Sequence, residues 1–275
     1  MKIETVDLYK YFHIEKAQGA AGYLTVYMHD VPTCDKRSAM IVIGGGAYKG
    51  ISPREQEPIA LTFLSKAYNT FTLQYSVKPF CYPTALIEAA MAVAYIRLNA
   101  EVLGVNSQSI GVVGFSAGGH LAALLGSAYN EECIVAALSE NAQFCRPDSI
   151  ILSYPVITAG EYAHRGSLDN LLGENNQDDR LLQYLSVENR VHSNSSPAFI
   201  WCTVDDELVP CENSFLIAKA YRKAGVPFEL HIFSTGVHGM ALATEETNTL
   251  EVSTISPSVS KWVELAILWL EKIIK

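Results

Sequence analysis

The sequence predicts an α/β fold, with a mostly parallel central sheet and helices packed on both faces. Apolar runs of strand length alternate along the chain with segments of helical periodicity, which is the pattern of such a fold. The strand-like runs are apolar at consecutive positions, as is typical of strands buried on both faces of a parallel sheet. The 275 residues, 49% of them hydrophobic, are enough to bury one core, so we expect a single domain over 1–275.

The predicted elements follow one another in a regular order. A segment with period-2 character at 22–29 predicts an antiparallel strand at the edge of the sheet. The remaining predicted strands lie at 38–43, 69–77, 109–115, 148–154, 198–204 and 228–233. Apolar residues at helical spacing predict helices at 58–64, 83–99, 117–127, 216–224 and 260–274.

The alternation breaks between residues 159 and 194, where the chain becomes polar and rich in Gly, Asn and Ser. Short helical pieces are predicted there at 167–172 and 178–185. Loops of this length are most often functional, so we expect an insertion at the rim of the sheet that partly caps a site.

Composition limits the partners. A formal net charge of −9 disfavours nucleic acid and anionic membranes and is compatible with a neutral or cationic small molecule. No run approaches the roughly 18 apolar residues of a membrane span, and the charged N-terminal residues predict no signal peptide, so we expect a cytoplasmic protein. The six cysteines form no C-x-x-C pair, and no metal site is predicted. Nothing in the sequence indicates the oligomeric state.

A G-x-S-x-G pentapeptide at 114–118 places Ser116 where a predicted strand runs into a predicted helix. In that context the serine occupies a sharp turn that raises its hydroxyl above the sheet. The N-terminus of the following helix also directs free N–H groups toward the serine. The motif predicts that Ser116 is a nucleophile.

A serine nucleophile needs a histidine base that a carboxylate orients, in the chain order Ser, Asp or Glu, His. The predicted strand 198–204 ends at Asp205 and Asp206, and the strand 228–233 ends in a loop that carries His238. The residues alone leave Asp205 and Asp206 as equal candidates for the acid. His120 is the alternative base, but it lies in the helix that follows the serine and is better explained as a hydrogen-bonded packing residue.

The tetrahedral intermediate of acyl transfer needs two or more backbone N–H donors. The residue after the nucleophile, Ala117, supplies one of them. The glycine run 44–46 follows the strand 38–43 and is expected to supply the others. A phosphate loop is the alternative, but the G-K-S/T spacing that it requires is missing.

These motifs together resemble the esterase/lipase branch of the α/β-hydrolases, and within it the acetyl-xylan-esterase-like and BD-FAE-like bacterial sugar-ester hydrolases. The similar stretches cover most of the chain and comprise G-G-G-A-Y at 44–48, S-P-R-E-Q-E-P at 52–58, Y-P-T-A at 82–85, G-F-S-A-G-G-H-L-A at 114–122, A-H-R-G-S at 163–167, D-D-E-L-V-P at 205–210 and G-V-H-G at 236–239. The resemblance implies an α/β-hydrolase fold with a small partial cap.

The resemblance also implies which residues act. The acid corresponds to Asp206, and the oxyanion donors correspond to Gly45, Gly46 and Ala117. The family's leading histidine is replaced by Ile43, which removes any hydrogen bond by which that histidine braces the loop.

The implied activity is a serine carboxylesterase that needs no cofactor and cleaves small acyl esters, acetyl esters above all, with a sugar as one candidate alcohol. Tyr48, His164 and Arg165 are candidate substrate contacts at the rim, with purely structural roles as the alternative. A serine peptidase or amidase of the same fold and a non-catalytic binding protein are the competing interpretations. The peptidase lacks support because oligopeptidases usually carry a large extra domain, and the binding protein because every member of the triad is present.

Overall fold

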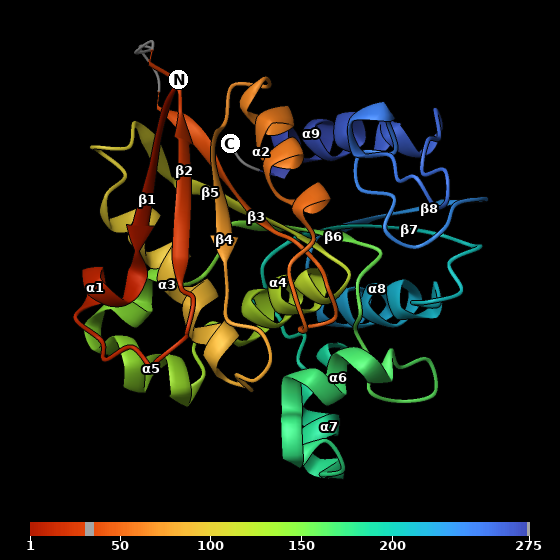
Figure 1. Cartoon of the computed structure of the whole chain (residues 1–275), viewed down its shortest axis with the longest axis horizontal. Coiled ribbons are helices and arrows are strands. Elements are labelled where there is room, and N and C mark those ends of the chain that lie inside the picture. The colour runs from red at the N-terminus through yellow and green to blue at the C-terminus, as the bar shows by residue number, and fades with distance from the viewer. Residues whose placement is uncertain (31–35, 274–275) are drawn as a thin grey trace.

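A single eight-stranded sheet organises the chain in the computed structural model, which describes residues 1–30 and 36–273 (Figure 1). Its strand order is β1-β2-β4-β3-β5-β6-β7-β8. Strands β3 to β8 run parallel, whereas β2 pairs antiparallel with both β1 and β4. The strands are β1 (Lys2–Asp7), β2 (Tyr23–Met28), β3 (Arg37–Ile43), β4 (Asn69–Gln74), β5 (Val105–Phe115), β6 (Ser149–Ser153), β7 (Ala198–Thr203) and β8 (Phe228–Phe233).

Helices connect these strands, and short 3₁₀ turns join several of them. The α-helices are α1 (Leu8–Phe12), α2 (Glu57–Leu64), α3 (Thr84–Leu98), α4 (Ala117–Ala128), α5 (Glu132–Leu138), α6 (Arg165–Leu172), α7 (Asp179–Leu185), α8 (Glu212–Ala224) and α9 (Trp262–Ile273). The 3₁₀ turns are η1 (Pro53–Glu55), η2 (Ser139–Phe144), η3 (Gly173–Asn175), η4 (Val187–Asn189), η5 (Glu245–Thr247) and η6 (Val259–Lys261).

Helices cover both faces of the sheet, as the sequence predicts. Alternate side chains of the inner strands enter two separate cores: Ile41 belongs to the core that also holds residues of α3, α4 and α8, whereas Val42 belongs to the core that holds residues of α2 and α9. Figure 1 shows α2 and α9 on one side of the sheet and α3, α4 and α8 on the other. The alternation of strands and helices therefore forms the α/β fold expected from the sequence.

The prediction for the first strand is partly wrong. Strand β2 is antiparallel, as expected, but it lies inside the sheet because β1 pairs along its outer side, with Lys2 opposite Met28 and Asp7 opposite Tyr23. The short helices α1 and α5 were also not predicted. The predicted C-terminal helix lies at α9, although its last predicted residue, 274, lies outside the described residues.

The register of the parallel strands places three loops side by side at their carboxyl ends. Ile43 pairs with Gly114, and Phe115 pairs with Ser153. The glycine run, Ser116 and Tyr154 therefore leave the sheet next to one another, where ligands of open α/β sheets usually bind.

The predicted insertion holds α6 and α7, which lie together outside the two helical layers (Figure 1). Over residues 1–30 and 36–273, no single helix has the length and apolar character to cross a membrane. The bent pair formed by Ala117–Ala128 and Glu132–Phe144 meets that test by length and composition alone, with an angle of 84° between its parts.

Candidate active site

Ser116 lies on a strained turn between β5 and α4. Its φ of 52° and ψ of −117° lie outside the regions that a non-glycine residue ordinarily adopts. The turn is possible because glycines flank it closely: a Cβ at Gly114 would lie 2.2 Å from the carbonyl oxygen of Gly118, and one at Gly118 would lie 2.3 Å from that of Ile43. The sequence therefore folds into the serine elbow that the pentapeptide predicts.

A chain of hydrogen bonds runs from Ser116 to a buried carboxylate. Nε2 of His238 lies 2.8 Å from Oγ of Ser116, and Nδ1 of His238 lies 2.7 Å from Oδ2 of Asp206. The Asp206 side chain is fully buried, and its Oδ1 accepts the backbone N–H groups of Leu208 and Val209. Because a carboxylate only accepts, Nδ1–H of His238 donates to Asp206 and Nε2 is left to accept the serine proton.

The positions of the side chains decide between the two candidate acids and between the two candidate bases. Asp205 is exposed, whereas Asp206 turns inward to His238, so the geometry selects Asp206. His120 is fully buried: its Nε2–H donates to the carbonyl of Leu185, and its Nδ1 accepts from the hydroxyl of Tyr48. Burial lowers the pKa of His120 to about 4. His120 is therefore a packing residue, as the sequence indicates.

One of the three oxyanion donors that the resemblance implies, Gly45, already has another partner. The N–H of Gly45 donates to Oε2 of the buried carboxylate of Glu55 over 2.8 Å, so Gly45 is not free to bind an oxyanion. The N–H groups of Gly46 and Ala117 find no protein acceptor within the described part of the chain. Ala117 opens α4, where the first N–H groups lack intrahelical partners. Gly46 and Ala117 remain the candidate donors.

The glycine loop is braced despite the isoleucine at position 43. The hydroxyl of Tyr75 donates to the carbonyl of Gly44 over 2.8 Å, and Nδ2 of Asn170 donates to the carbonyl of Ala47 over 2.9 Å. The contact between Tyr48 and His120 adds a third attachment. These bonds hold the loop that a leading histidine would otherwise brace.

The three candidate rim contacts have different surroundings. Tyr48 is only 2% exposed and its hydroxyl bonds His120, so the expectation that Tyr48 lines the rim is wrong. Its backbone, with φ of 54°, turns the side chain into the core. Arg165 is bound within the insertion, to Asp169 and to the carbonyl of Asn176.

His164 lies near the reacting groups. It is half-buried, and its Nδ1 lies 2.7 Å from Oγ of Ser167. Burial lowers the pKa of His164, as does His238 when it is protonated, while Asp206 opposes the shift. His164 therefore lies within electrostatic reach of His238 and remains a candidate substrate contact.

Sequence reasoning missed the buried carboxylate of Glu55, which binds both Gly45 and the hydroxyl of Tyr154. The only signal was the charged stretch 54–57, in which Glu55 and Glu57 look equivalent. Over the described residues, no group of three His, Cys, Asp or Glu side chains gathers to hold a metal ion. Cys34 lies outside those residues.

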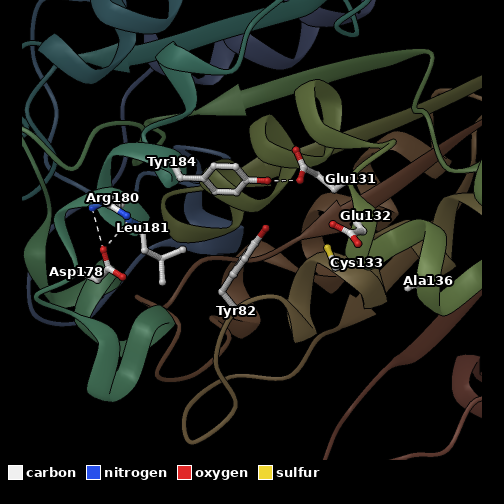
Figure 2. Close-up of a pocket in the computed structure, with 9 residues that line it drawn as sticks. All are labelled: Tyr82, Glu131, Glu132, Cys133, Ala136, Asp178, Arg180, Leu181 and Tyr184. Atoms are coloured by element: carbon white, nitrogen blue, oxygen red, sulfur yellow. Dashed lines mark hydrogen bonds between the residues drawn. The ribbon is translucent and has the colours of Figure 1, made fainter.

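A separate pocket of about 590 Å³ lies between α7 and the start of α5 (Figure 2). Tyr184 reaches across it from α7 and donates to Glu131, and the ring of Tyr82 lies below (Figure 2). The lining residues are Tyr82, Glu131, Glu132, Cys133, Ala136, Asp178, Arg180, Leu181 and Tyr184. Ser116, His238 and Asp206 are not among them, so this pocket is distinct from the site at the serine elbow.

The sheet and the serine elbow define an α/β-hydrolase fold, and the chain is similar to known hydrolases. The model of the BD-FAE family matches residues 24–221, and the chain belongs to that family. It is similar to the acetyl ester-xyloside bifunctional hydrolase of Caldicellulosiruptor lactoaceticus, with 41% identity and a TM-score of 0.79 over 91% of this chain and 88% of that one.

Two curated relatives are larger than this chain. Endo-1,4-beta-xylanase B of Butyrivibrio fibrisolvens is 35% identical over 86% of the chain and 37% of its own length. Acetylxylan esterase of Xylanibacter ruminicola is 31% identical over 75% of the chain and 42% of its own length. The chain thus matches about two fifths of the length of these relatives.

Proposed function

We propose that this chain is a serine carboxylesterase that hydrolyses small acyl esters, acetyl esters above all, carried on sugars. The observation that carries the proposal is the hydrogen-bonded series Ser116, His238 and Asp206 at the strained end of β5. A nucleophile, a base within 2.8 Å and a carboxylate that fixes the tautomer of the base are the parts that acyl transfer requires.

The proposed reaction proceeds in two steps through an acyl-enzyme. Nε2 of His238 takes the proton of Ser116 as Oγ attacks the ester carbonyl, and the N–H groups of Gly46 and Ala117 bind the oxyanion. The C–O bond to the alcohol then breaks, and the alcohol leaves with the proton from His238. Water, deprotonated by the same histidine, attacks the acyl-serine and releases the acid.

The choice of a sugar acetate rests on the relatives. An acetylxylan esterase and an acetyl ester-xyloside hydrolase are both similar to the chain. The net charge of −9 is compatible with a neutral carbohydrate ester and disfavours polyanions. His164, near His238 on the inserted segment, is the candidate for contact with the alcohol part.

A panel of p-nitrophenyl esters of increasing acyl length, together with an aminoacyl p-nitroanilide and acetylated xylo-oligosaccharide, tests the proposal. We expect turnover to be fastest on the acetate, to fall with chain length and to include the acetylated sugar. Cleavage of the anilide alone would favour a peptidase, and inactivity on every substrate would favour a binding protein. Ser116→Ala is the control. Hydrolysis by this variant would show that Ser116 is not the nucleophile.

A further inference from the structure

Two adjacent residues outside the proposed triad connect the loops that carry it. Glu55, in η1, is 4% exposed and uses both carboxylate oxygens. Oε2 accepts the N–H of Gly45 over 2.8 Å, and Oε1 accepts the hydroxyl of Tyr154 over 2.7 Å. A buried carboxylate is costly unless such donors satisfy it, so the position requires a specific arrangement of its neighbours.

The first of these bonds holds Gly45 directly against the nucleophile. A Cβ built on Gly45 would lie 2.9 Å from Cβ of Ser116 and 2.9 Å from Oε2 of Glu55. Gly45 is therefore packed between the serine and the carboxylate. Any movement of Glu55 shifts the glycine loop relative to Ser116.

The second bond leads to the loop of the histidine. The hydroxyl of Tyr154, which donates to Glu55, accepts the N–H of Ala241 over 3.0 Å. The ring of Tyr154 also lies edge-on to the ring of His238, with centroids 5.1 Å apart. Burial and the charge of Glu55 raise the pKa of Tyr154, so its hydroxyl stays protonated and can donate.

Arg54 binds the same loop from its other side. Its guanidinium donates to the carbonyl of Gly239, the residue after His238, over 3.1 Å. It also donates to the carbonyl of Thr247 and to Oγ1 of Thr254. The turn η1 is thus bonded to two loops. Glu55 binds the glycine run 44–46, and both residues bind the loop that carries His238, Glu55 through Tyr154 and Arg54 directly.

We propose that Arg54 and Glu55 are positioning residues that set the distance and orientation between the oxyanion donors and the His238–Ser116 pair. This inference rests on the proposed function and names the groups that hold its site in shape. Neither residue contacts the reacting atoms, so each acts through the loops it binds. A misplacement of about 1 Å can lower a rate by about 10²-fold. Loss of the hydrogen bonds of Arg54 or of Glu55 should therefore lower kcat more than it weakens substrate binding.

The test compares Glu55→Gln and Arg54→Lys with two matched control variants. Glu88→Gln changes another buried carboxylate, which accepts hydrogen bonds from Ser76 and Tyr9. Arg97→Lys changes another arginine that donates to several backbone carbonyls, those of residues 107, 144 and 146. Both controls should lower the melting temperature while the folded enzyme keeps its kcat.

For Glu55→Gln we expect kcat on p-nitrophenyl acetate to fall about 10- to 100-fold while KM stays within about twofold. Arg54→Lys keeps the charge and should lower kcat about 3- to 10-fold, which also provides a readout if Glu55→Gln fails to fold. A folded Glu55→Gln or Arg54→Lys with kcat within twofold of wild type would overturn the inference, as would an equal loss in Glu88→Gln.

A fluorophosphonate probe, which labels a reactive serine without ester hydrolysis, separates this inference from the proposed function. If wild type labels at Ser116 but hydrolyses no ester, the esterase proposal fails, and the labelling rates of the variants still judge the positioning role. We expect labelling of Glu55→Gln to slow in parallel with kcat. Equal labelling rates in wild type and Glu55→Gln would overturn the positioning role, and no labelling of wild type would overturn both proposals.

Discussion

Acid should destabilise this protein through His120, because that histidine is buried in its neutral form. Its Nε2–H donates to Leu185 and its Nδ1 accepts from Tyr48, so a second ring proton would reverse the bond to Tyr48 and place a positive charge in the core. Burial lowers the pKa from 6.5 to about 4. The stabilising contribution is fully present above about pH 6.5 and is lost progressively as the pH falls toward about 4, because the unfolded chain binds the proton more readily.

The size of the effect follows from the shift. At about 1.4 kcal/mol per pKa unit, His120 should account for a loss of up to about 3 kcal/mol in the free energy of unfolding across that range. Urea unfolding at a series of pH values between 7.5 and 4.5 measures it. His120→Gln, which retains a donor for Leu185, should be less stable than wild type at pH 7.5 and should show a flatter pH dependence.

A control variant tests whether the dependence belongs to His120. His192→Gln removes a half-buried histidine that contacts the carbonyl of Ser127 and leaves His120 in place. Burial raises the pKa of Glu88, so acid should stabilise the fold through this residue. Glu88 is present in wild type, His120→Gln and His192→Gln, so its effect is the same in all three. An equal pH dependence in wild type and His120→Gln would show that His120 is not the source of the acid sensitivity.

Two further predictions concern the site. Asp206→Asn should lower kcat on p-nitrophenyl acetate about 10³- to 10⁴-fold, because an amide can hold the wrong tautomer of His238, whereas Asp205→Asn should leave it nearly unchanged; a large loss in the exposed Asp205 variant would contradict the assignment. Tyr75→Phe removes the hydroxyl that binds Gly44 and should lower the free energy of unfolding by about 1–3 kcal/mol in urea titration, since a buried carbonyl loses its donor. A Tyr75→Phe protein as stable as wild type would show that this brace is dispensable.

The sheet was predictable where burial controls the sequence. Strands β3, β6 and β7 are apolar over most of their length because helices cover both faces of the sheet, and these runs are visible in the sequence. Strand β1 reads K-I-E-T-V-D and lies at the edge, largely exposed, so no apolar run marks it. Its partner β2 was therefore placed at the edge, one position too far out.

The site residues could be predicted from the sequence where they directly follow a strand. Ser116, the aspartate pair and His238 each follow a strand, and parallel strands bring their carboxyl ends together. The choice of Asp206 over Asp205 depends on which side chain faces the histidine loop, and the residues alone leave it open. Glu55 could not be recognised because its burial depends on contacts with Gly45 and Tyr154 from distant parts of the chain.

The burial of the Tyr48 side chain could also not be predicted from the sequence. An aromatic residue after a glycine run is typical of a pocket rim, and the sequence does not reveal the left-handed backbone at Ala47 and Tyr48. That conformation directs the ring toward His120 and into the core. The difference shows that side-chain direction in a tight loop is set by backbone angles and not by residue type.

In the proposed mechanism, Ser116 carries the acyl group during turnover. Rapid acid quench of the enzyme with p-nitrophenyl acetate, followed by peptide mass spectrometry, tests it most directly. We expect one acetyl group on the peptide that contains Ser116 in the wild-type protein, and neither acetylation nor turnover in Ser116→Ala. Acetylation at another residue, or wild-type turnover by Ser116→Ala, would contradict it.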